Sequence, residues 1–274
     1  MDIPAFIRKN GLIWGPEPEI YKGLAGFYTY GPLGKLLKNK VELLIRETFR
    51  SAGFWEVEAP TIMPTVVWEA SGHLAGFVDP IIVCKKCSAS YRADKLIEEK
   101  HDVVADSFSK KKLLDFIKKN AMLCPSCKGS FLPEIQEYNL MMKTTVGRNK
   151  EAFLRPETAT TTYLPFKRYY EFFRKTLPIK VFQIGKVFRN EISPRQSVLR
   201  GREFTQAEAQ LFINDKSKFD DYNLIKDVKI PFWPASAQKK GKPKQYKVSY
   251  ALKKKWVKSK AYAYCLSLGY MFVA

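Results

Sequence analysis

Residues 180–213 read KVFQIGKVFRNEISPRQSVLRGREFTQAEAQLFI and contain two segments in which apolar and polar residues alternate. Two strands joined by a loop with Pro194 and Gly201 account for this pattern, because successive side chains of a strand point to opposite faces. One face of the first strand holds Phe182, Ile184 and Phe188, and the other holds Gln183, Val187, Arg189 and Glu191. The second strand has an apolar face with Thr205, Ala207, Ala209, Leu211 and Ile213, opposite Phe204, Gln206, Glu208 and Gln210. The sequence predicts an antiparallel pair with one buried face and one polar face.

The polar face of this pair has the components of a nucleotide site. A guanidinium such as Arg189 binds phosphate through its planar fork, and an aromatic ring such as Phe204 stacks on a base. Carboxylates such as Glu191 and Glu208 accept hydrogen bonds from an amine. A solvated sheet face is the alternative, and periodicity alone favours it.

The charge of the chain indicates a polyanionic partner. The 274 residues include 47 Lys and Arg against 27 Asp and Glu, which gives a net charge of +20. Such a balance favours nucleic acid, although a lysine-rich hyperthermophile composition would also produce it. The sequence has neither a secretory signal pattern nor a run of about 18 apolar residues, so we expect a cytoplasmic protein without a membrane partner.

Four of the five cysteines form two C-x-x-C pairs, Cys84 with Cys87 and Cys124 with Cys127. Two such pairs supply the four sulfur ligands of a closed, structural zinc site. The 36 residues between the pairs exceed the usual spacing, and residues 107–122, SFSKKKLLDFIKKNAM, are typical of a helix in this interval. Redox thiols or cysteines without a ligand are the alternative. Cys265 lies in an apolar run and is expected in the core.

Elsewhere the sequence predicts a long helix and a strand near the N-terminus. Residues 33–54 repeat apolar residues at helical spacing, and Gly53 ends the helix. The following strand, residues 54–64, contains Pro60 and therefore lies at an edge or a bulge, where a dimer contact or a simple loop cap are equally compatible. Residues 237–247, AQKKGKPKQYK, are expected to form an exposed loop or a basic module that faces solvent or contacts RNA.

Several long stretches resemble one enzyme family. Residues 188–204, FRNEISPRQSVLRGREF, resemble motif 2 of the class II aminoacyl-tRNA synthetases, and IGKVFRNEISPR resembles specifically the archaeal/eukaryotic-type glycyl-tRNA synthetases. Residues 23–49 and 52–80 resemble the N-terminal segment and motif 1 of that family. CKKCSASYRADKLIE resembles its zinc-bearing insertion, and FLRPETA resembles its glycine-binding loop.

The resemblance implies that the protein activates glycine with ATP and transfers it to tRNA(Gly). Arg189 would be the catalytic residue, stabilising charge on the α-phosphate as the glycine carboxylate attacks. The ATP-binding residues implied are Arg189, Glu191, Arg200 and Phe204. Glu157, Glu208 and Arg155 would form a glycine pocket that leaves no room for a Cβ atom. Mg²⁺ would accompany ATP, and structural Zn²⁺ would be held by Cys84, Cys87, Cys124 and Cys127.

The implied fold is α+β, an antiparallel sheet flanked by helices, with a zinc-binding insertion. Residues 1–83 would be the first part of the catalytic core with motif 1, and residues 84–135 the insertion. Residues 136–214 would carry the glycine-binding loop and motif 2, and residues 215–274 a basic insertion and a return to the core. Motif 1 implies a homodimer.

The sequence departs from the family pattern in three respects. RPETATT stands where the family usually has RPETAQG, and Ser197 and Gly201 replace a glycine and a branched residue. Motif 3 and an anticodon-binding domain are not found, so we expect that a second chain or a missing segment supplies them and that this chain alone is weakly active or inactive. A catalytically incomplete paralogue that binds tRNA or ATP is the alternative. An unrelated zinc-ribbon RNA-binding protein would leave the face with Arg189 and Phe204 unexplained.

Overall fold

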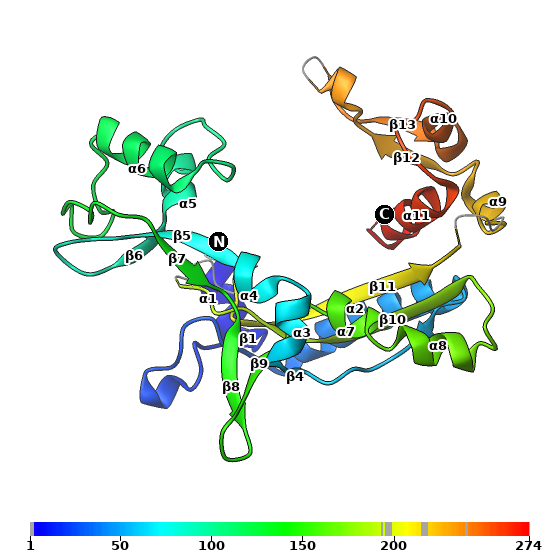
Figure 1. The fold of residues 1–274 in the computed structure, drawn as a ribbon, viewed down its shortest axis with the longest axis horizontal. Coiled ribbons are helices and arrows are strands. Elements are labelled where there is room, and N and C mark those ends of the chain that lie inside the picture. Colours follow the sequence, from blue (N-terminus) through cyan, green and yellow to red (C-terminus); the bar gives the residue numbers. More distant parts are fainter. Residues whose placement is uncertain (1–2, 193, 195–198, 215–218, 239–240, 274) are drawn as a thin grey trace. The chain divides into compact units, whose positions relative to one another are not determined.

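The computed structural model describes residues 3–192, 194, 199–214, 219–238 and 241–273. The chain divides into two compact units, and Figure 1 identifies the elements of each. The first unit comprises Met1–Lys35, Pro60–Glu157 and Gly185–Gln206, and the second comprises Leu36–Ala59, Thr158–Ile184 and Ala207–Ala274. Helices and mostly antiparallel sheets make up both units, as the α+β prediction requires.

The N-terminal part of the first unit is a short antiparallel pair preceded by a helix. Its elements are α1 (Ile3–Lys9), β1 (Ile13–Trp14), the 3₁₀ helix η1 (Glu19–Tyr21) and β2 (Thr29–Tyr30). A three-stranded antiparallel sheet follows, in the order β4-β9-β8, with β4 at Ile62–Pro64, β8 at Met142–Val146 and β9 at Lys150–Leu154. Helices α3 (Thr65–Ala70) and α4 (His73–Gly76) follow β4 in the chain. Trp68, Met141 and Phe153 form the small core of this region.

Residues 78–139 of the first unit, which we call the cysteine module, have a sheet and a core of their own. The sheet order is β6-β5-β7, with β5 at Val78–Val83, β6 at Ser90–Arg92 and β7 at Gln136–Asn139. The module also contains α5 (Ala93–Glu98) and α6 (Lys110–Lys119). The predicted helix is confirmed as α6, which begins after Ser109, whose side chain accepts a hydrogen bond from the Lys112 N–H. Leu113 and Ile117 are buried in the module core.

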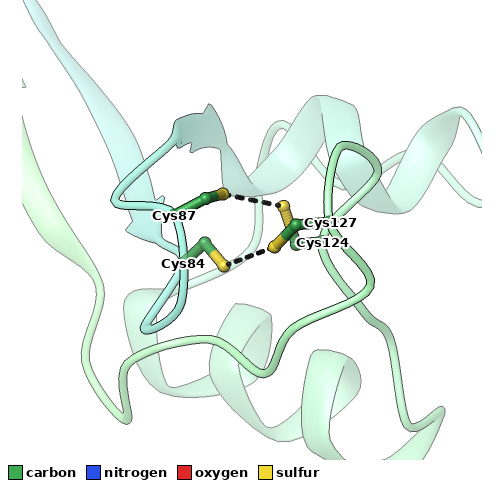
Figure 2. Close-up of side chains that lie close together, drawn as sticks. All are labelled: Cys84, Cys87, Cys124 and Cys127. Carbon is green, nitrogen blue, oxygen red and sulfur yellow. Dashed lines mark hydrogen bonds between the residues drawn. The ribbon is translucent and has the colours of Figure 1, made fainter.

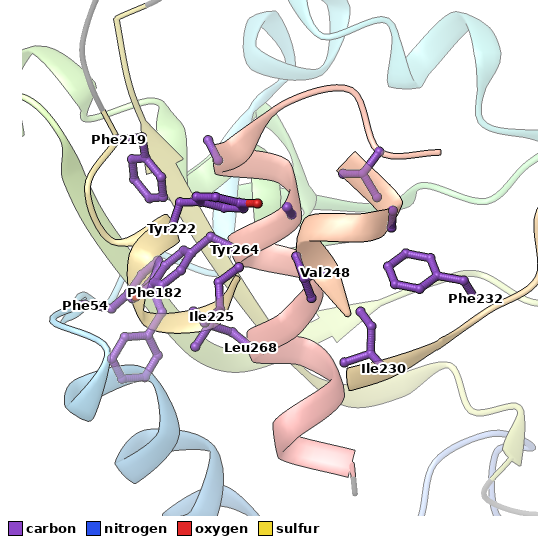
Figure 3. Close-up of a cluster of buried hydrophobic side chains, with 14 residues drawn as sticks. Phe54, Phe182, Phe219, Tyr222, Ile225, Ile230, Phe232, Val248, Tyr264 and Leu268 are labelled. Carbon is purple, nitrogen blue, oxygen red and sulfur yellow. The ribbon is translucent and has the colours of Figure 1, made fainter. Parts of the chain in front are cut away.

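The second unit is built around a larger apolar cluster, shown in Figure 3. Phe54, Phe182, Tyr264 and Leu268 are among its members. The elements of this unit are α2 (Pro32–Ser51, from Leu36 onward), β3 (Trp55–Glu56), α7 (Ala159–Tyr163), α8 (Phe166–Phe172), α9 (Tyr222–Ile225), β12 (Lys229–Phe232), η3 (Ala235–Ala237), β13 (Lys244–Lys247), α10 (Val248–Lys253) and α11 (Lys260–Val273). The predicted N-terminal helix is confirmed as α2, and Gly53 follows it with a positive φ of 79°.

The two strands predicted from residues 180–213 exist, as β10 (Ile179–Phe188) and β11 (Glu203–Phe212). They are neighbours in a sheet of order β11-β10-β3, in which β3 is parallel to β10. The predicted division into a buried and a polar face is wrong for β10. Gln183 and Val187, expected on the polar face, are fully buried, because this strand is covered on both sides. Along β11 every residue is half-buried.

Three further expectations need correction. Pro60 is not within a strand, because the predicted strand is interrupted: β3 ends at Glu56 and β4 begins at Ile62, each at the edge of its sheet. Cys265, expected in the core, is exposed on α11. Part of the lysine-rich stretch expected to be a loop is β13, which pairs antiparallel with β12. No helix in the described part of the chain is long and apolar enough to cross a membrane.

Candidate active site and candidate metal centre

Arg155 is a buried arginine at the end of β9. Its side chain is enclosed, with the residue 2% exposed, and Nε donates to the carbonyl oxygen of Lys186 at 2.8 Å. The backbone N–H of Phe188 donates to the Arg155 carbonyl at 2.9 Å. A Cβ atom at Gly185 would stand 2.1 Å from Nη2 of Arg155, so only glycine leaves room for this guanidinium. Arg155 therefore fixes the loop that begins with Pro156 and Glu157 onto the end of β10.

Arg189 directly follows β10, and its guanidinium contacts two aromatic rings. Its guanidinium carbon is 5.4 Å from the centroid of the Phe77 ring and 5.2 Å from that of Phe204. Its Nε donates to the carbonyl oxygen of Pro156 at 3.2 Å, and its backbone N–H donates to the Arg202 carbonyl at 2.9 Å. Cation–π contacts with two rings and the Nε hydrogen bond restrict the rotamers of the arginine.

Glu157 is held by a histidine that sequence reasoning did not find. Its Oε1 lies 3.4 Å from Nε2 of His73, and the two side chains are 32% and 17% exposed. Nδ1 of His73 is 2.8 Å from the Ser71 hydroxyl. His73 lies within residues 52–80, which resemble motif 1, and only its proximity to the RPET loop in three dimensions reveals the contact.

Glu191 and Arg200 have charged neighbours from the cysteine module. Arg92 forms a fork on Asp94, with Nη2 to Oδ2 at 2.6 Å, and its Nη1 lies 3.2 Å from Oδ1 of Asp79. Burial raises the pKa of the Asp79 carboxyl above its ordinary value; the Arg92 guanidinium opposes this, and the charge of Glu191 adds to it. Asp79 and Arg92 therefore interact electrostatically with Glu191 of the predicted ATP site. No local sequence pattern indicates this interaction.

Two glycines allow a close backbone approach beside motif 2. The N–H of Arg202 donates to the Gly26 carbonyl at 2.7 Å. A Cβ atom at Gly26, whose φ is +89°, would stand 2.9 Å from the Arg202 nitrogen, and one at Gly201 would stand 3.0 Å from the Glu203 carbonyl oxygen. Gly201 thus has a physical reason to replace a branched residue. Ser197, the other departure, lies outside the described residues.

Thr161, one of the two residues at which RPETATT departs from RPETAQG, belongs to a buried polar network in the second unit. Gln183 Nε2 donates to the Thr158 carbonyl at 2.9 Å and to the Thr161 hydroxyl at 3.0 Å, and it also contacts the Thr162 hydroxyl. Both hydroxyls donate to the same Thr158 carbonyl. Gln183 therefore anchors α7 to β10, which explains why an amide is buried there.

The predicted site residues fall into two groups. Arg155, Glu157, Arg189, Glu191, Arg200 and Phe204 all belong to the first unit. Glu208 belongs to the second unit, where Gln210 Nε2 donates to its Oε1 at 3.1 Å. Its place in the glycine pocket stays a prediction.

The four paired cysteines converge, as Figure 2 shows. All four sulfur atoms lie within 4.8 Å of one another, with Cys84 and Cys127 at 3.5 Å and Cys87 and Cys124 at 3.7 Å. Sulfurs at the corners of a tetrahedron around zinc are separated by about 3.8 Å. Each C-x-x-C pair is followed by a residue with positive φ, Ser88 at 56° and Lys128 at 59°, so the two knuckles turn alike. The geometry fits a closed four-sulfur metal site.

The thiols of this cluster differ in acidity. Burial would raise the pKa of Cys124, but hydrogen bonds from the Tyr91 hydroxyl and from backbone N–H groups lower it to about 6. The Gly129 N–H favours the Cys127 thiolate, yet the neighbouring sulfurs of Cys87 and Cys84 and burial raise its pKa to about 12. Four thiolates this close repel one another, and a cation at their centre would remove that cost.

Comparison with known proteins places these features in one family. Residues 142–261 match the family model described as the tRNA synthetase class II core domain (G, H, P, S and T). The chain is 43% identical to a glycine–tRNA ligase of Thermococcus kodakarensis, over 94% of this chain and 46% of that protein. It is 46% identical to a glycine–tRNA ligase of Pyrococcus horikoshii, over 85% of this chain and 41% of that protein. The chain thus spans less than half the length of these curated relatives.

Similar solved structures include two other synthetases. One is described as the RNA-binding domain of threonyl-tRNA synthetase from Cryptosporidium parvum, with 20% identity and a TM-score of 0.46 over 76% of this chain and 36% of that one. The other is Giardia lamblia prolyl-tRNA synthetase with prolyl-adenylate, with 18% identity and a TM-score of 0.42 over 75% of this chain and 29% of that one. The assignment depends on the family model and the curated relatives: residues 142–261 match the class II tRNA synthetase core domain, and the chain is similar to archaeal glycine–tRNA ligases over most of its length.

Proposed function

We propose that this chain carries the amino-acid activation site of a glycine–tRNA ligase, a site that forms glycyl-adenylate from glycine and ATP. One observation supports this most directly: Arg189, the proposed phosphate ligand, donates to the carbonyl of Pro156, the residue before the proposed ammonium ligand Glu157. The groups for the two substrates are therefore tied by one hydrogen bond. Relatives named glycine–tRNA ligase support the choice of substrates.

In the proposed reaction the protein acts by orientation and electrostatics. Glu157 binds the glycine ammonium, so the carboxylate of glycine is directed toward the α-phosphate held by Arg189. The guanidinium stabilises negative charge that grows on the phosphate as the carboxylate oxygen attacks and pyrophosphate leaves. Phe204 offers its ring to adenine, and Glu191 accepts from the adenine amino group. Arg200 and Mg²⁺ neutralise the remaining phosphates. Arg155 keeps the Glu157 loop in place, and Glu208 adds a second carboxylate to the glycine pocket.

The four cysteines are proposed to hold one structural Zn²⁺. Four sulfur ligands leave no open coordination position, so the ion would stabilise the cysteine module and take no part in the reaction. The positive charge of the chain is proposed to meet the backbone of tRNA(Gly), with an affinity that falls as salt rises. A cytoplasmic location stays a prediction.

A homodimer through motif 1 is proposed from the exposed apolar face of α2. Leu36 and Leu37 are each 59% exposed, and Leu33 and Val41 are 53% and 46% exposed. A row of leucines at this spacing is costly in water and typical of a surface that a second copy covers. Leu37→Glu should convert a dimer to a monomer in sedimentation velocity. A wild-type chain that sediments as a monomer at all concentrations would exclude the dimer.

Glycine-dependent ATP–pyrophosphate exchange tests the proposed activity. The chain should be assayed alone and with a polypeptide that supplies the remaining part of a glycine–tRNA ligase, because it spans less than half the length of its curated relatives. In the condition that supports exchange, Arg189→Ala should reduce exchange by about 10²-fold or more without lowering the melting temperature. Normal exchange in this variant would defeat the role of Arg189. Absence of exchange in both conditions would favour a paralogue that binds tRNA or ATP.

A further inference from the structure

We propose that residues 71–77, SGHLAGF, form a positioning element for the adenylate site. Through His73 this element orients the carboxylate of Glu157, and through Phe77 it orients the guanidinium of Arg189. Neither residue would touch the reacting atoms, so both are positioning residues. This inference rests on the proposed function, because it assigns supports to the two side chains that bind the substrates there.

His73 can direct Glu157 because both of its ring nitrogens are engaged. Nδ1 lies 2.8 Å from the Ser71 hydroxyl and Nε2 lies 3.4 Å from Oε1 of Glu157. The Ser71 hydroxyl is also placed to donate to the Trp68 carbonyl at 3.4 Å, so Ser71 can accept from Nδ1 or donate to it. In the tautomer whose hydrogen is on Nε2, the ring can donate toward Oε1 of Glu157. The ring itself is fixed edge to face by Trp68, at 5.4 Å between centroids and an angle of 78°.

Phe77 is the second ring that contacts Arg189. The Phe77 and Phe204 centroids are 5.4 and 5.2 Å from the guanidinium carbon. A base that stacks on Phe204 would compete with Arg189 for that ring, whereas Phe77 is partly buried and packs against the cluster of Trp68, Met141 and Phe153. Phe77 is therefore the ring that can hold the guanidinium when the nucleotide is bound.

The backbone of the element is tied to the strands that carry the site. The Leu140 N–H donates to the Phe77 carbonyl at 2.9 Å, and the Asn190 N–H donates to the Leu140 carbonyl at 2.8 Å. Asn139 Nδ2 donates to the Leu74 carbonyl at 2.8 Å. These bonds connect Phe77 to the residue next to Arg189, so the element and the arginine are held in one hydrogen-bonded frame.

The two supports predict different binding defects. Loss of the His73 contact affects only ligands with an ammonium group, because Glu157 binds that group. Loss of the Phe77 ring affects any ligand with a phosphate or its mimic. Two probes separate these effects: glycyl-sulfamoyl adenosine, a stable mimic of glycyl-adenylate, and its acetyl analogue, which lacks the amine.

Titration calorimetry on the full chain with both probes tests the inference. His73→Leu should weaken the glycyl probe about tenfold and leave the acetyl probe unchanged, and His73→Gln, which keeps an N–H near Nε2, should restore most of the affinity. Phe77→Leu should weaken binding of both probes about three- to tenfold, and Phe77→Tyr should restore it.

His101→Leu, at the second histidine of the chain, is the matched control and should bind both probes as wild type does. Ser71→Ala should show the His73→Leu pattern more weakly, and it serves as the test if His73→Leu does not fold.

The outcomes separate the inference from the function on which it rests. A wild-type chain that binds neither probe, both alone and with the polypeptide that supplies the remaining part of the ligase, would overturn the proposed function and this inference with it. A wild-type chain that binds the glycyl probe, with His73 and Phe77 variants that bind both probes equally well, would overturn only the inference. A His73→Leu variant that loses both probes to the same extent would show a merely structural role for His73 and would also overturn it.

Discussion

The cysteine module and the β10–β11 strands illustrate two ways in which a chain builds a functional region. In the module, each pair of cysteines is separated by two residues and lies on one tight turn. A small apolar core packs against the four cysteines. Around β10, by contrast, side chains are held by residues that are distant in sequence: Arg189, directly after β10, is contacted by Phe77, and Glu157, which follows β9, is contacted by His73. Mutation of a ligand in the cysteine module should therefore unfold the module. Mutation of a supporting residue around β10 should instead misorient the substrate-binding side chains and leave the fold largely intact.

The largest effect is expected when the cysteine cluster is broken. Cys124→Ser should abolish binding of one zinc per chain and unfold the cysteine module, because metal binding in such sites contributes about 10 kcal/mol or more to folding. Metal analysis and proteolysis within residues 78–139 measure this. Cys265→Ser, at the exposed cysteine of α11, is the control and should retain the metal. Equal metal content in the two variants would contradict the site.

The next effect concerns the ion cluster of Arg92. Arg92→Met leaves the carboxylates of Asp94, which is 2% exposed, and Asp79, which is 7% exposed, without their cation, and should cost about 3–5 kcal/mol in the free energy of unfolding. Arg50→Met is the matched control, since the Arg50 side chain is 60% exposed beside Glu56, and should cost less than about 1 kcal/mol. Similar losses would show that burial does not distinguish the pairs.

The same variant carries a pH signature. Burial would raise the pKa of Asp94, but the hydrogen bond and charge of Arg92 lower it below the ordinary value of 3.8. Because the folded-state pKa is depressed, the stability gained from this pair is present above about pH 4 and is lost as pH falls through the folded-state pKa. The difference between wild type and Arg92→Met, measured by denaturant unfolding, should therefore shrink in acid. A constant difference from pH 7 to pH 3 would rule out this account.

A smaller loss is expected in the buried network of β10. Gln183→Leu keeps the side-chain volume but removes the donor to the Thr158 carbonyl and the Thr161 hydroxyl, at an expected cost of about 1–3 kcal/mol. Gln210→Leu on β11, where Gln210 is half-buried, should cost less than about 1 kcal/mol. Urea unfolding curves compare the two, and a smaller loss for Gln183→Leu would refute the network.

The most local change is at Gly185. Gly185→Ala places a Cβ atom 2.1 Å from Nη2 of Arg155, so the guanidinium must move, at a cost of about 1–3 kcal/mol. Weaker binding of glycyl-sulfamoyl adenosine should accompany this loss. Gly269→Ala in α11, where nothing lies within 4 Å of the added atom, should instead stabilise the protein by about 0.5–1 kcal/mol. An unchanged melting temperature for Gly185→Ala would remove Arg155 from its proposed role.

The contrast also explains which features the sequence could predict. Helices α2 and α6 and the convergence of four cysteines follow from spacing within short segments, and all three are confirmed. The existence of β10 and β11 followed from alternation as well. Alternation could not reveal that β10 is covered on both sides, so Gln183 was placed on the wrong face. The contacts of His73, Phe77 and Arg92 join segments far apart in the chain, and no spacing rule within one segment encodes them.

The close approach of Gly26 and Gly201 has a consequence for comparing relatives. Neither glycine leaves room for a side chain. A Cβ atom at Gly26 would meet Arg202, and a Cβ atom at Gly201 would stand 3.3 Å from the Gly26 carbonyl oxygen. In a homologue with a branched side chain at the second position, the backbone around Gly26 must give by about a few tenths of an ångström. The two positions should therefore be exchanged together when chimeric enzymes are made.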